Sequence, residues 1–309
     1  MSTGILLMAY GSPRTPDEIE AYYTHIRRGR PPTPELLEEL RERYEAIGGS
    51  KLDEITRAQA AGVAAELERR HPGEFVVEIG NKHAPPFVED GVRALHDKGV
   101  DRAIGLVLAP HYSQYSVGQY VTRAQAAAEE LGGPPFSFVE SWHLDEGYLA
   151  FLEATVGAAL SSLEPAARED AEVIFTAHSL PERLVLNTGD PYPDQLRETA
   201  EAVAARLGLR RFSTAWQSAG RTPEPWIGPD VLDHMDAVAA AGATGIVVCS
   251  CGFTVDHLEV LYDVDVECVA RARALGIPFA RSASLNAGPE LIATVSDALF
   301  AHIAAQQVA

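Results

Sequence analysis

The sequence predicts an α/β protein of two flavodoxin-like (Rossmann-like) domains, each a parallel sheet flanked by helices. Three observations predict this fold. Short apolar runs typical of buried strands alternate with longer segments of helical periodicity. The alternation occurs in two halves of similar size, which indicates two domains. Polar residues and turn formers follow several of the apolar runs, at the edge where parallel sheets place their chemistry.

In the first half, residues 5–10 form a continuous apolar run, which is typical of a strand covered on both faces. The run ends at a Gly-Ser-Pro turn. Three further strands are predicted at 75–80, 103–109 and 136–140. The intervening segments predict helices at 17–28, 34–47, 53–71, 86–98 and 119–131. Strands separated by helices and short loops predict a parallel sheet with right-handed crossovers.

The second half repeats the pattern after a helix predicted at 146–163. Its strands are predicted at 173–177, 211–216, 245–249 and 277–281. Its helices are predicted at 194–207, 229–241, from the turn at Gly252 to 267, and 289–305. We therefore expect domains at 1–145 and 146–309, with the last helix able to pack back on the first half. The active site is expected in the cleft between the domains, at the carboxyl ends of the strands.

The charge of the chain limits its partners. Lys and Arg number 25 against 44 Asp and Glu, so the net charge is −19 with histidine neutral. A strongly acidic protein is a poor ligand for nucleic acid and for anionic membrane surfaces. It is compatible with a cationic ligand such as a metal ion. No apolar run approaches the ~20 residues of a membrane span, and we expect neither a span nor a signal peptide.

Cysteine usage indicates a reducing compartment. The three cysteines, Cys249, Cys251 and Cys268, are too few for a disulfide framework. The spacing of Cys249 and Cys251 is too tight for the usual zinc pair, and a fourth thiolate is missing. We therefore expect core thiols and a cytoplasmic protein.

An acidic segment follows the strand predicted at 245–249. Glu259, Asp263 and Glu267 are four residues apart, and at about 100° per residue they drift by only about 40° per step along an α-helix. They therefore form one stripe. Like charges this close repel each other unless a cation lies among them. The alternative is a solvated helix face in an acidic protein.

His178 and Glu259 both come just after predicted strands of the second half. Because the carboxyl ends of parallel strands share one edge, the two side chains are expected to converge. An imidazole beside a carboxylate can bind a divalent metal or accept protons. The alternative is a structural histidine.

Three residues of the first half also lie at or just after the ends of predicted strands. Tyr10 ends the first strand, and Lys82 and His83 follow the second. Five arginines add positive charge to this half: Arg27, Arg28, Arg30, Arg41 and Arg43. Guanidinium groups bind carboxylates in a bidentate manner, so these arginines suit a ligand with carboxylate groups. The alternative is surface pairing with nearby glutamates. Two tryptophans, Trp216 and Trp226, suit either a flat aromatic ligand or the core.

Six segments of the chain resemble the ferrochelatase family. They are residues 22–30, 43–49, 108–111, 177–181, 216–218 together with 225–226, and 256–263, and they include Ala-His-Ser-Leu-Pro and Asp-His-Leu-Glu-Val-Leu-Tyr-Asp. The resemblance runs from Leu6 to the last helix in one register apart from small gaps. It is strongest to the soluble, Gram-positive-type branch that metallates coproporphyrin III.

The resemblance implies roles for individual residues. His178 and Glu259 match the inner iron site, which also takes part in removing pyrrole protons. Glu259, Asp263 and Glu267 match an acidic ridge that is a proposed path for hydrated Fe²⁺, and Tyr10 matches a tyrosine on the opposite face of the macrocycle. Lys82 and His83 match a pair found in this subgroup. The positions that hold the propionates match Arg27, Arg43, Tyr44, Ser50 and Tyr120. Near Ser50 the loop is one residue shorter than the family pattern.

The activity implied is insertion of Fe²⁺ into coproporphyrin III in haem biosynthesis, giving Fe-coproporphyrin III and two protons. Open alternatives are a protoporphyrin IX ferrochelatase, a cobalt chelatase on the same fold, and a haem or metal carrier. No permanent cofactor and no iron–sulfur cluster are expected, because Fe²⁺ is a substrate. Expected partners are the porphyrin, ferrous iron and, transiently, neighbouring haem-pathway enzymes. The protein is expected to be a monomer.

Overall fold

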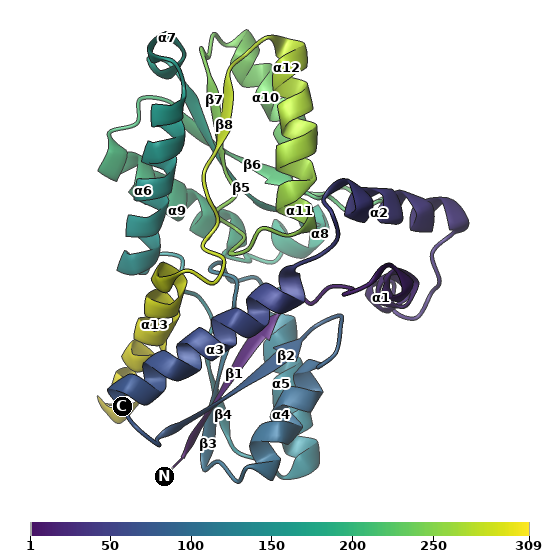
Figure 1. Ribbon diagram of the computed structural model, residues 1–309, viewed down its shortest axis with the longest axis vertical. Helices are drawn as coiled ribbons and strands as arrows, with labels where there is room; N and C mark the ends of the chain where they lie inside the picture. The colour runs from purple at the N-terminus through teal and green to yellow at the C-terminus, as the bar shows by residue number, and fades with distance from the viewer. Residues whose placement is uncertain (1, 309) are drawn as a thin grey trace. The chain divides into compact units, whose positions relative to one another are not determined.

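The computed structural model describes residues 2–308 and is drawn in Figure 1. The chain forms two compact units. Unit 1 comprises Met1–Ala109, Ser116–Ser141 and Asn286–Ala309, and unit 2 comprises Pro110–Tyr115 and Trp142–Leu285. Each unit contains one sheet. The domain division at 1–145 and 146–309 stays a prediction.

The sheet of unit 1 has four parallel strands in the order β2-β1-β3-β4. Their bounds are β1 Thr3–Ala9, β2 Phe75–Asn81, β3 Arg102–Val107 and β4 Phe136–Val139. Every residue of β1 is buried, which explains its uninterrupted apolar sequence. The residue after this strand, Tyr10, therefore emerges from the centre of the sheet.

Five α-helices connect or extend these strands in unit 1. They are α1 Ile19–Ile26, α2 Pro34–Ala46, α3 Leu52–Arg70, α4 Val88–Asp97 and α5 Val117–Leu131. A short 3₁₀ helix, η1 Pro16–Glu18, precedes α1. The helix α2 begins as the sequence predicts, with Thr33 accepting from the backbone N–H of Leu36 at 3.4 Å and Pro34 at the first position.

The last helix, α13 Pro289–Val308, packs against α3 within unit 1. Gly62 permits this close approach, because an added Cβ would lie 2.3 Å from Cδ1 of Ile292. An ion pair between Arg70 and Asp297, at 2.5 Å, joins the same two helices. The carboxyl-terminal helix is therefore part of the unit that contains the amino terminus.

The sheet of unit 2 also has four parallel strands, in the order β6-β5-β7-β8. Their bounds are β5 Glu172–His178, β6 Phe212–Gln217, β7 Ile246–Cys249 and β8 Phe279–Arg281. The helices are α6 Glu146–Ser162, α7 Pro165–Arg168, α8 Glu182–Val185, α9 Tyr192–Leu207, α10 Val231–Ala240, α11 Leu258–Leu261 and α12 Val269–Leu275. A π-helix, η2 Asp263–Cys268, lies between α11 and α12.

The two sheets repeat one topology, because in each the first strand lies between the second and the third. This is the flavodoxin-like strand order, in which ligands bind where the connections diverge from the first strand. The predicted fold class, two parallel sheets flanked by helices, is confirmed. The strands β1 and β5 occupy equivalent places, so Tyr10 and His178 end equivalent strands.

The chain after β7 differs from the prediction. We predicted one helix from the turn at Gly252 to residue 267, but α11 begins only at Leu258 and the π-helix begins at Asp263. The intervening loop is fixed by the N–H of Gly252, which donates to the carbonyl of Thr176 at 2.9 Å. A Cβ on Gly252 would lie 2.4 Å from Cβ of Ala177. The tertiary contact of this loop with β5 therefore displaces the start of the helix.

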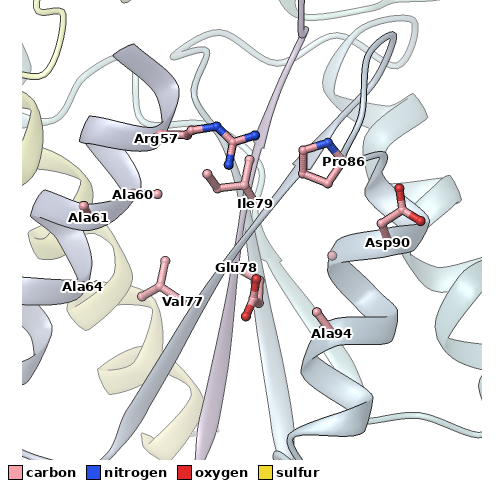
Figure 2. Close-up of a pocket in the computed structure, with 11 residues that line it drawn as sticks. Arg57, Ala60, Ala61, Ala64, Val77, Glu78, Ile79, Pro86, Asp90 and Ala94 are labelled. Atoms are coloured by element: carbon pink, nitrogen blue, oxygen red, sulfur yellow. The ribbon is translucent and has the colours of Figure 1, made fainter. Parts of the chain in front are cut away.

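A hollow of about 260 Å³ lies on the outer edge of β2 (Figure 2). Arg57 and three alanines of α3 line one wall, α4 lines the other, and Val77, Glu78 and Ile79 of β2 lie between them. None of the residues predicted to bind porphyrin or iron lines this hollow. The predicted site residues are therefore found elsewhere.

The three cysteines are free and buried, which confirms that they are core thiols. No helix within residues 2–308 is long and apolar enough to cross a membrane.

Candidate active site

His178 and Glu259 lie side by side in unit 2. His178 is the last residue of β5, and Glu259 lies in the first turn of α11. Nε2 of His178 is 3.7 Å from Oε1 of Glu259, and the two side chains are 32% and 26% exposed. Both groups thus remain accessible to a ligand.

The backbone selects the tautomer of His178. Its Nδ1 is hydrogen-bonded to the carbonyl oxygen of Ser179, and a carbonyl can only accept, so Nδ1 carries the proton. In that tautomer Nε2 presents a lone pair toward Glu259. The separation of 3.7 Å is too long for a direct hydrogen bond. At this separation a metal cation fits between the two electron-pair donors, and each of them can separately accept a proton.

His257 is a second histidine beside Glu259, and sequence reasoning gave it no role. Its Nε2 lies 3.7 Å from Oε2 of Glu259, so the carboxylate is flanked by an imidazole at each oxygen. Burial lowers the pKa of His257, and the nearby Glu259 carboxylate opposes that shift. The feature of the sequence that could have identified His257 is its position two residues before Glu259, in the segment that resembles the ferrochelatases.

Gln217 connects the strand that contains His178 to the backbone of Glu259. It is the last residue of β6, pairs with His178 across the sheet, and is 1% exposed. Its backbone carbonyl accepts from the N–H of Ser179 at 2.8 Å. Its side-chain amide donates to the carbonyl of Glu259 at 2.5 Å. The buried Thr176 hydroxyl orients that amide by donating to Oε1 at 2.8 Å. Gln217 thereby positions both members of the pair, His178 through its backbone and Glu259 through its side chain.

The acidic stripe runs from α11 into the π-helix. Glu267 donates its backbone N–H to the carbonyl of Tyr262 at 3.0 Å, five residues earlier. A π-helix takes more residues per turn than an α-helix, so it counteracts the drift between Glu259, Asp263 and Glu267. The sequence prediction of a regular α-helix was wrong here.

The three carboxylates of the stripe differ in environment. Asp263 is only 6% exposed and accepts a hydrogen bond from Oγ of Ser218, while Glu259 and Glu267 are half-buried. Within residues 2–308, no group of three or more His, Cys, Asp or Glu side chains is arranged to hold a metal ion. The structure therefore brings His178 and Glu259 together and leaves the metal-binding roles of Asp263 and Glu267 as predictions.

In unit 1, Tyr10 and His83 lie together. The N–H of His83 donates to the carbonyl of Tyr10 at 2.9 Å, and the two ring centroids are 4.6 Å apart. Nδ1 of His83 lies 3.0 Å from Nδ1 of His25, so one ring donates and the other accepts. Burial, with the nearby Lys82, lowers the pKa of His83 to about 3. His83 is therefore a neutral ring beside Tyr10.

Lys82 is a half-buried cation of the same edge. Burial, together with Arg123 and Arg28, lowers its pKa to about 8. Its Nζ lies 5.2 Å from the ring centre of Tyr120, which is 3% exposed. Arg123 donates to the Lys82 carbonyl at 2.7 Å and pairs with Glu89 at 2.6 Å. These contacts fix the place of Lys82.

The remaining predicted porphyrin residues of unit 1 lie just after α1, in α2 and in the loop after α2. Nε of Arg27 is buried without a hydrogen-bond partner, so one donor is available to a ligand. Arg43 lies 3.6 Å from Glu39. Tyr44 is 6% exposed. Ser50 donates to Oγ of Ser12 at 2.8 Å and accepts from the N–H of Leu52 at 3.3 Å.

The fold is that of solved metal chelatases. Sirohydrochlorin chelatase SirB from Bacillus subtilis subspecies spizizenii in complex with cobalt aligns with a TM-score of 0.60 at 10% identity, covering 97% of this chain and 94% of that one. SirB from Bacillus subtilis with Fe³⁺ aligns with a TM-score of 0.59 at 13% identity, covering 97% and 95%. At these identities the likeness concerns the fold alone.

The chain belongs to the Ferrochelatase family, whose model matches residues 2–303. A coproporphyrin III ferrochelatase of Halalkalibacterium halodurans is 47% identical over 292 residues, covering 94% of this chain and 93% of the relative. Coproporphyrin III ferrochelatase 1 of Bacillus anthracis is 45% identical over 297 residues, covering 95% of each chain.

Proposed function

We propose that this chain is an enzyme that inserts Fe²⁺ into coproporphyrin III, giving Fe-coproporphyrin III and two protons, in haem biosynthesis. The observation that carries the proposal is the His178–Glu259 pair, with 3.7 Å between Nε2 and Oε1, in a member of the Ferrochelatase family. Relatives that are 43–47% identical along nearly the whole chain bear the name coproporphyrin III ferrochelatase.

The His178–Glu259 pair can bind the metal ion and can accept protons, and the reaction needs both. Metal bonds to imidazole nitrogen and carboxylate oxygen are about 2.0–2.2 Å long for a borderline divalent ion such as zinc. Donor atoms 3.7 Å apart in His178 and Glu259 can therefore bind one cation. When Fe²⁺ leaves for the four pyrrole nitrogens, the same donor atoms are released to accept the two displaced protons. His257 at the other carboxylate oxygen offers a next acceptor.

The residues of unit 1 are proposed to serve the porphyrin. Tyr10, beside the neutral ring of His83, is assigned to the macrocycle. Lys82, Arg27 and Arg43 are assigned to the propionates, since guanidinium and ammonium groups bind carboxylates. The unpartnered Nε of Arg27 supports this assignment. The proposed propionate set is therefore Lys82, Arg27, Arg43, Tyr44, Ser50 and Tyr120.

The acidic stripe is proposed to supply iron. Glu259, Asp263 and Glu267 follow one another along α11 and the π-helix. Negative charge raises the local concentration of Fe²⁺ next to the pair. The cytoplasmic location and the monomeric state remain proposals, the former supported by three free, buried cysteines.

Turnover separates the candidate functions. We expect the purified chain to consume coproporphyrin III and Fe²⁺ anaerobically, with a higher kcat/KM than for protoporphyrin IX. A cobalt chelatase prefers Co²⁺ and a sirohydrochlorin-like ring, and a carrier binds porphyrin without consuming it. Consumption of a sirohydrochlorin with Co²⁺ in preference to both porphyrins with Fe²⁺ contradicts the proposal.

A further inference from the structure

The guanidinium group of one arginine in unit 2 forms ion pairs with two aspartates, one before Glu259 in the sequence and one after it. Arg281 is the last residue of β8. Its Nε and Nη2 donate to the two carboxylate oxygens of Asp265 at 2.7 and 3.0 Å, which is the bidentate geometry of a strong charge-assisted pair. Its Nη1 donates to Oδ1 of Asp256 at 3.0 Å. We call these three residues the Arg281 clamp.

The clamp is more than an exposed surface pair. The Arg281 side chain is 18% exposed, and the carboxylates of Asp256 and Asp265 are 28% and 38% exposed. Nη1 also donates to the carbonyl of Ser282 at 3.1 Å, and Oγ of Ser284 donates to Asp256 at 2.8 Å. Exposed ion pairs contribute little because solvent screens them, whereas a partly buried bidentate pair in a network imposes geometry.

The two aspartates of the clamp lie on either side of His257 and Glu259 in the sequence. Asp256 immediately precedes His257 and lies three residues before Glu259, while Asp265 lies inside the π-helix. Arg281 itself is fixed to the sheet, because it pairs with Val248 of β7. The segment 256–265 is thus tied at both ends to β8. This arrangement limits the positions that the Glu259 carboxylate can take relative to His178.

The clamp also divides the acidic residues of this segment into those paired with Arg281 and those of the stripe. Asp256 and Asp265 are compensated by Arg281 and lie outside the stripe formed by Glu259, Asp263 and Glu267. Two roles are therefore distinguishable for Arg281. It either only cancels charge, or it holds the segment in the geometry that the His178–Glu259 pair needs.

We propose that Arg281 is a positioning residue for iron insertion, holding residues 256–265 so that Glu259 faces His178. This inference rests on the proposed function. Arg281 acts through the Asp256 and Asp265 carboxylates and touches neither His178 nor Glu259 in the contacts that fix it.

The two roles predict opposite kinetics for Arg281→Gln. A positioning residue gives a kcat at saturating Fe²⁺ that falls at least about tenfold. A residue that only cancels charge leaves kcat unchanged, and the more negative segment attracts Fe²⁺ more strongly, so the apparent KM for Fe²⁺ falls. Unchanged kcat with a lower KM for Fe²⁺ overturns the inference.

A double-mutant cycle with Asp265→Asn isolates the clamp from general destabilisation. Asparagine retains one oxygen acceptor but loses the charge and the bidentate pairing. We expect Asp265→Asn to lower kcat, and Arg281→Gln/Asp265→Asn to be no slower than Arg281→Gln alone. Independent, multiplicative losses contradict the inference. If Arg281→Gln does not fold, Arg281→Lys, which keeps the charge but not the fork, takes its place in the cycle.

A matched control and a readout independent of activity complete the test. Arg271→Gln in α12 removes an exposed pair with Asp236, whose charged atoms are 3.4 Å apart, and should leave kcat unchanged. Amide hydrogen exchange across 258–268 should accelerate in Arg281→Gln and not in Arg271→Gln. Wild-type protein that does not metallate coproporphyrin defeats the proposed function, whereas unaltered exchange in Arg281→Gln defeats the clamp.

Discussion

Oγ of Ser218 donates a hydrogen bond to Oδ2 of Asp263, so the middle carboxylate of the acidic stripe is buried and partnered. Ser218 reaches it from the loop after β6, with φ of 61° in the left-handed region that non-glycine residues rarely adopt. The preceding residue, Gln217, holds the backbone of Glu259. Two consecutive residues thereby hold the backbone of Glu259 and the carboxylate of Asp263.

The stripe can be tested by neutralising its members separately. Glu259→Gln removes a ligand and a base, so kcat should fall severely at every Fe²⁺ concentration. Asp263→Asn and Glu267→Gln leave the His178–Glu259 pair in place, so their double mutant should mainly raise the apparent KM for Fe²⁺, with kcat within about threefold of wild type. Steady-state kinetics against anaerobic Fe²⁺ measure both quantities.

The control for net charge is Glu290→Gln at the start of α13, which removes one negative charge from the exposed surface of unit 1. This control should change neither kcat nor the apparent KM for Fe²⁺. If the double mutant keeps the wild-type KM for Fe²⁺, Asp263 and Glu267 have only a structural role and do not supply iron.

His178→Ala should fold and nearly abolish chelation. The side chain is one third exposed at a strand end, so its loss leaves no buried cavity, while the pair with Glu259 loses one donor atom. We expect kcat to fall at least about 100-fold, which corresponds to roughly 2.7 kcal/mol in the barrier. The exposed His71→Ala is the control. Activity within about threefold of wild type, roughly 0.7 kcal/mol, refutes an essential role.

Substrate preference should depend on Arg43. Coproporphyrin III has four propionates where protoporphyrin IX has two, and Arg27 and Arg43 are the arginines proposed to bind them. Arg43→Ala should lower kcat/KM for coproporphyrin more than for protoporphyrin. Arg41→Ala, which removes an exposed pair with Glu38 at 3.7 Å, provides the matched control. Equal efficiency of the wild type on both porphyrins contradicts the preference.

Lys82 should give the reaction a pH dependence. Its pKa is lowered to about 8, so the ammonium loses its proton as pH rises through 8. Since kcat/KM reports the ionisation of the free enzyme, kcat/KM for the porphyrin should fall above about pH 8. Lys82→Met should lower kcat/KM below pH 8 and remove this decline. Lys98→Met, at an exposed pair with Glu78, should retain it. A wild-type profile that is flat to pH 9.5 argues against the assignment.

Gly62→Ala should destabilise unit 1. The added methyl group would lie 2.3 Å from Cδ1 of Ile292, and forcing an extra methyl group into packed helices costs about 1–3 kcal/mol. The gain in helix propensity, about 1 kcal/mol, offsets part of this cost. We expect a lower Tm, restored by adding Ile292→Val. A Tm equal to or above wild type in the single mutant means that α13 is free to shift.

The apolar runs of the sequence predicted the strands because a parallel strand is buried on both faces, which β1 and β5 demonstrate. They could not predict the start of α11. The loop before it is held by a hydrogen bond from Gly252 to Thr176, residues far apart in the chain. Local periodicity carries no information on such a contact.

For the candidate site, the sequence by itself determined the residue types and their places at strand ends: His178 after one buried run and Glu259 after another. This suffices because strand periodicity and parallel connections place those ends at one edge. The tertiary structure decided what each group contacts. It placed His257 at the second oxygen of Glu259, buried Asp263 against Ser218, and brought Arg281 to both ends of the acidic segment. These contacts join residues from different strands and loops, and their energies depend on burial and distance, which chain order does not specify.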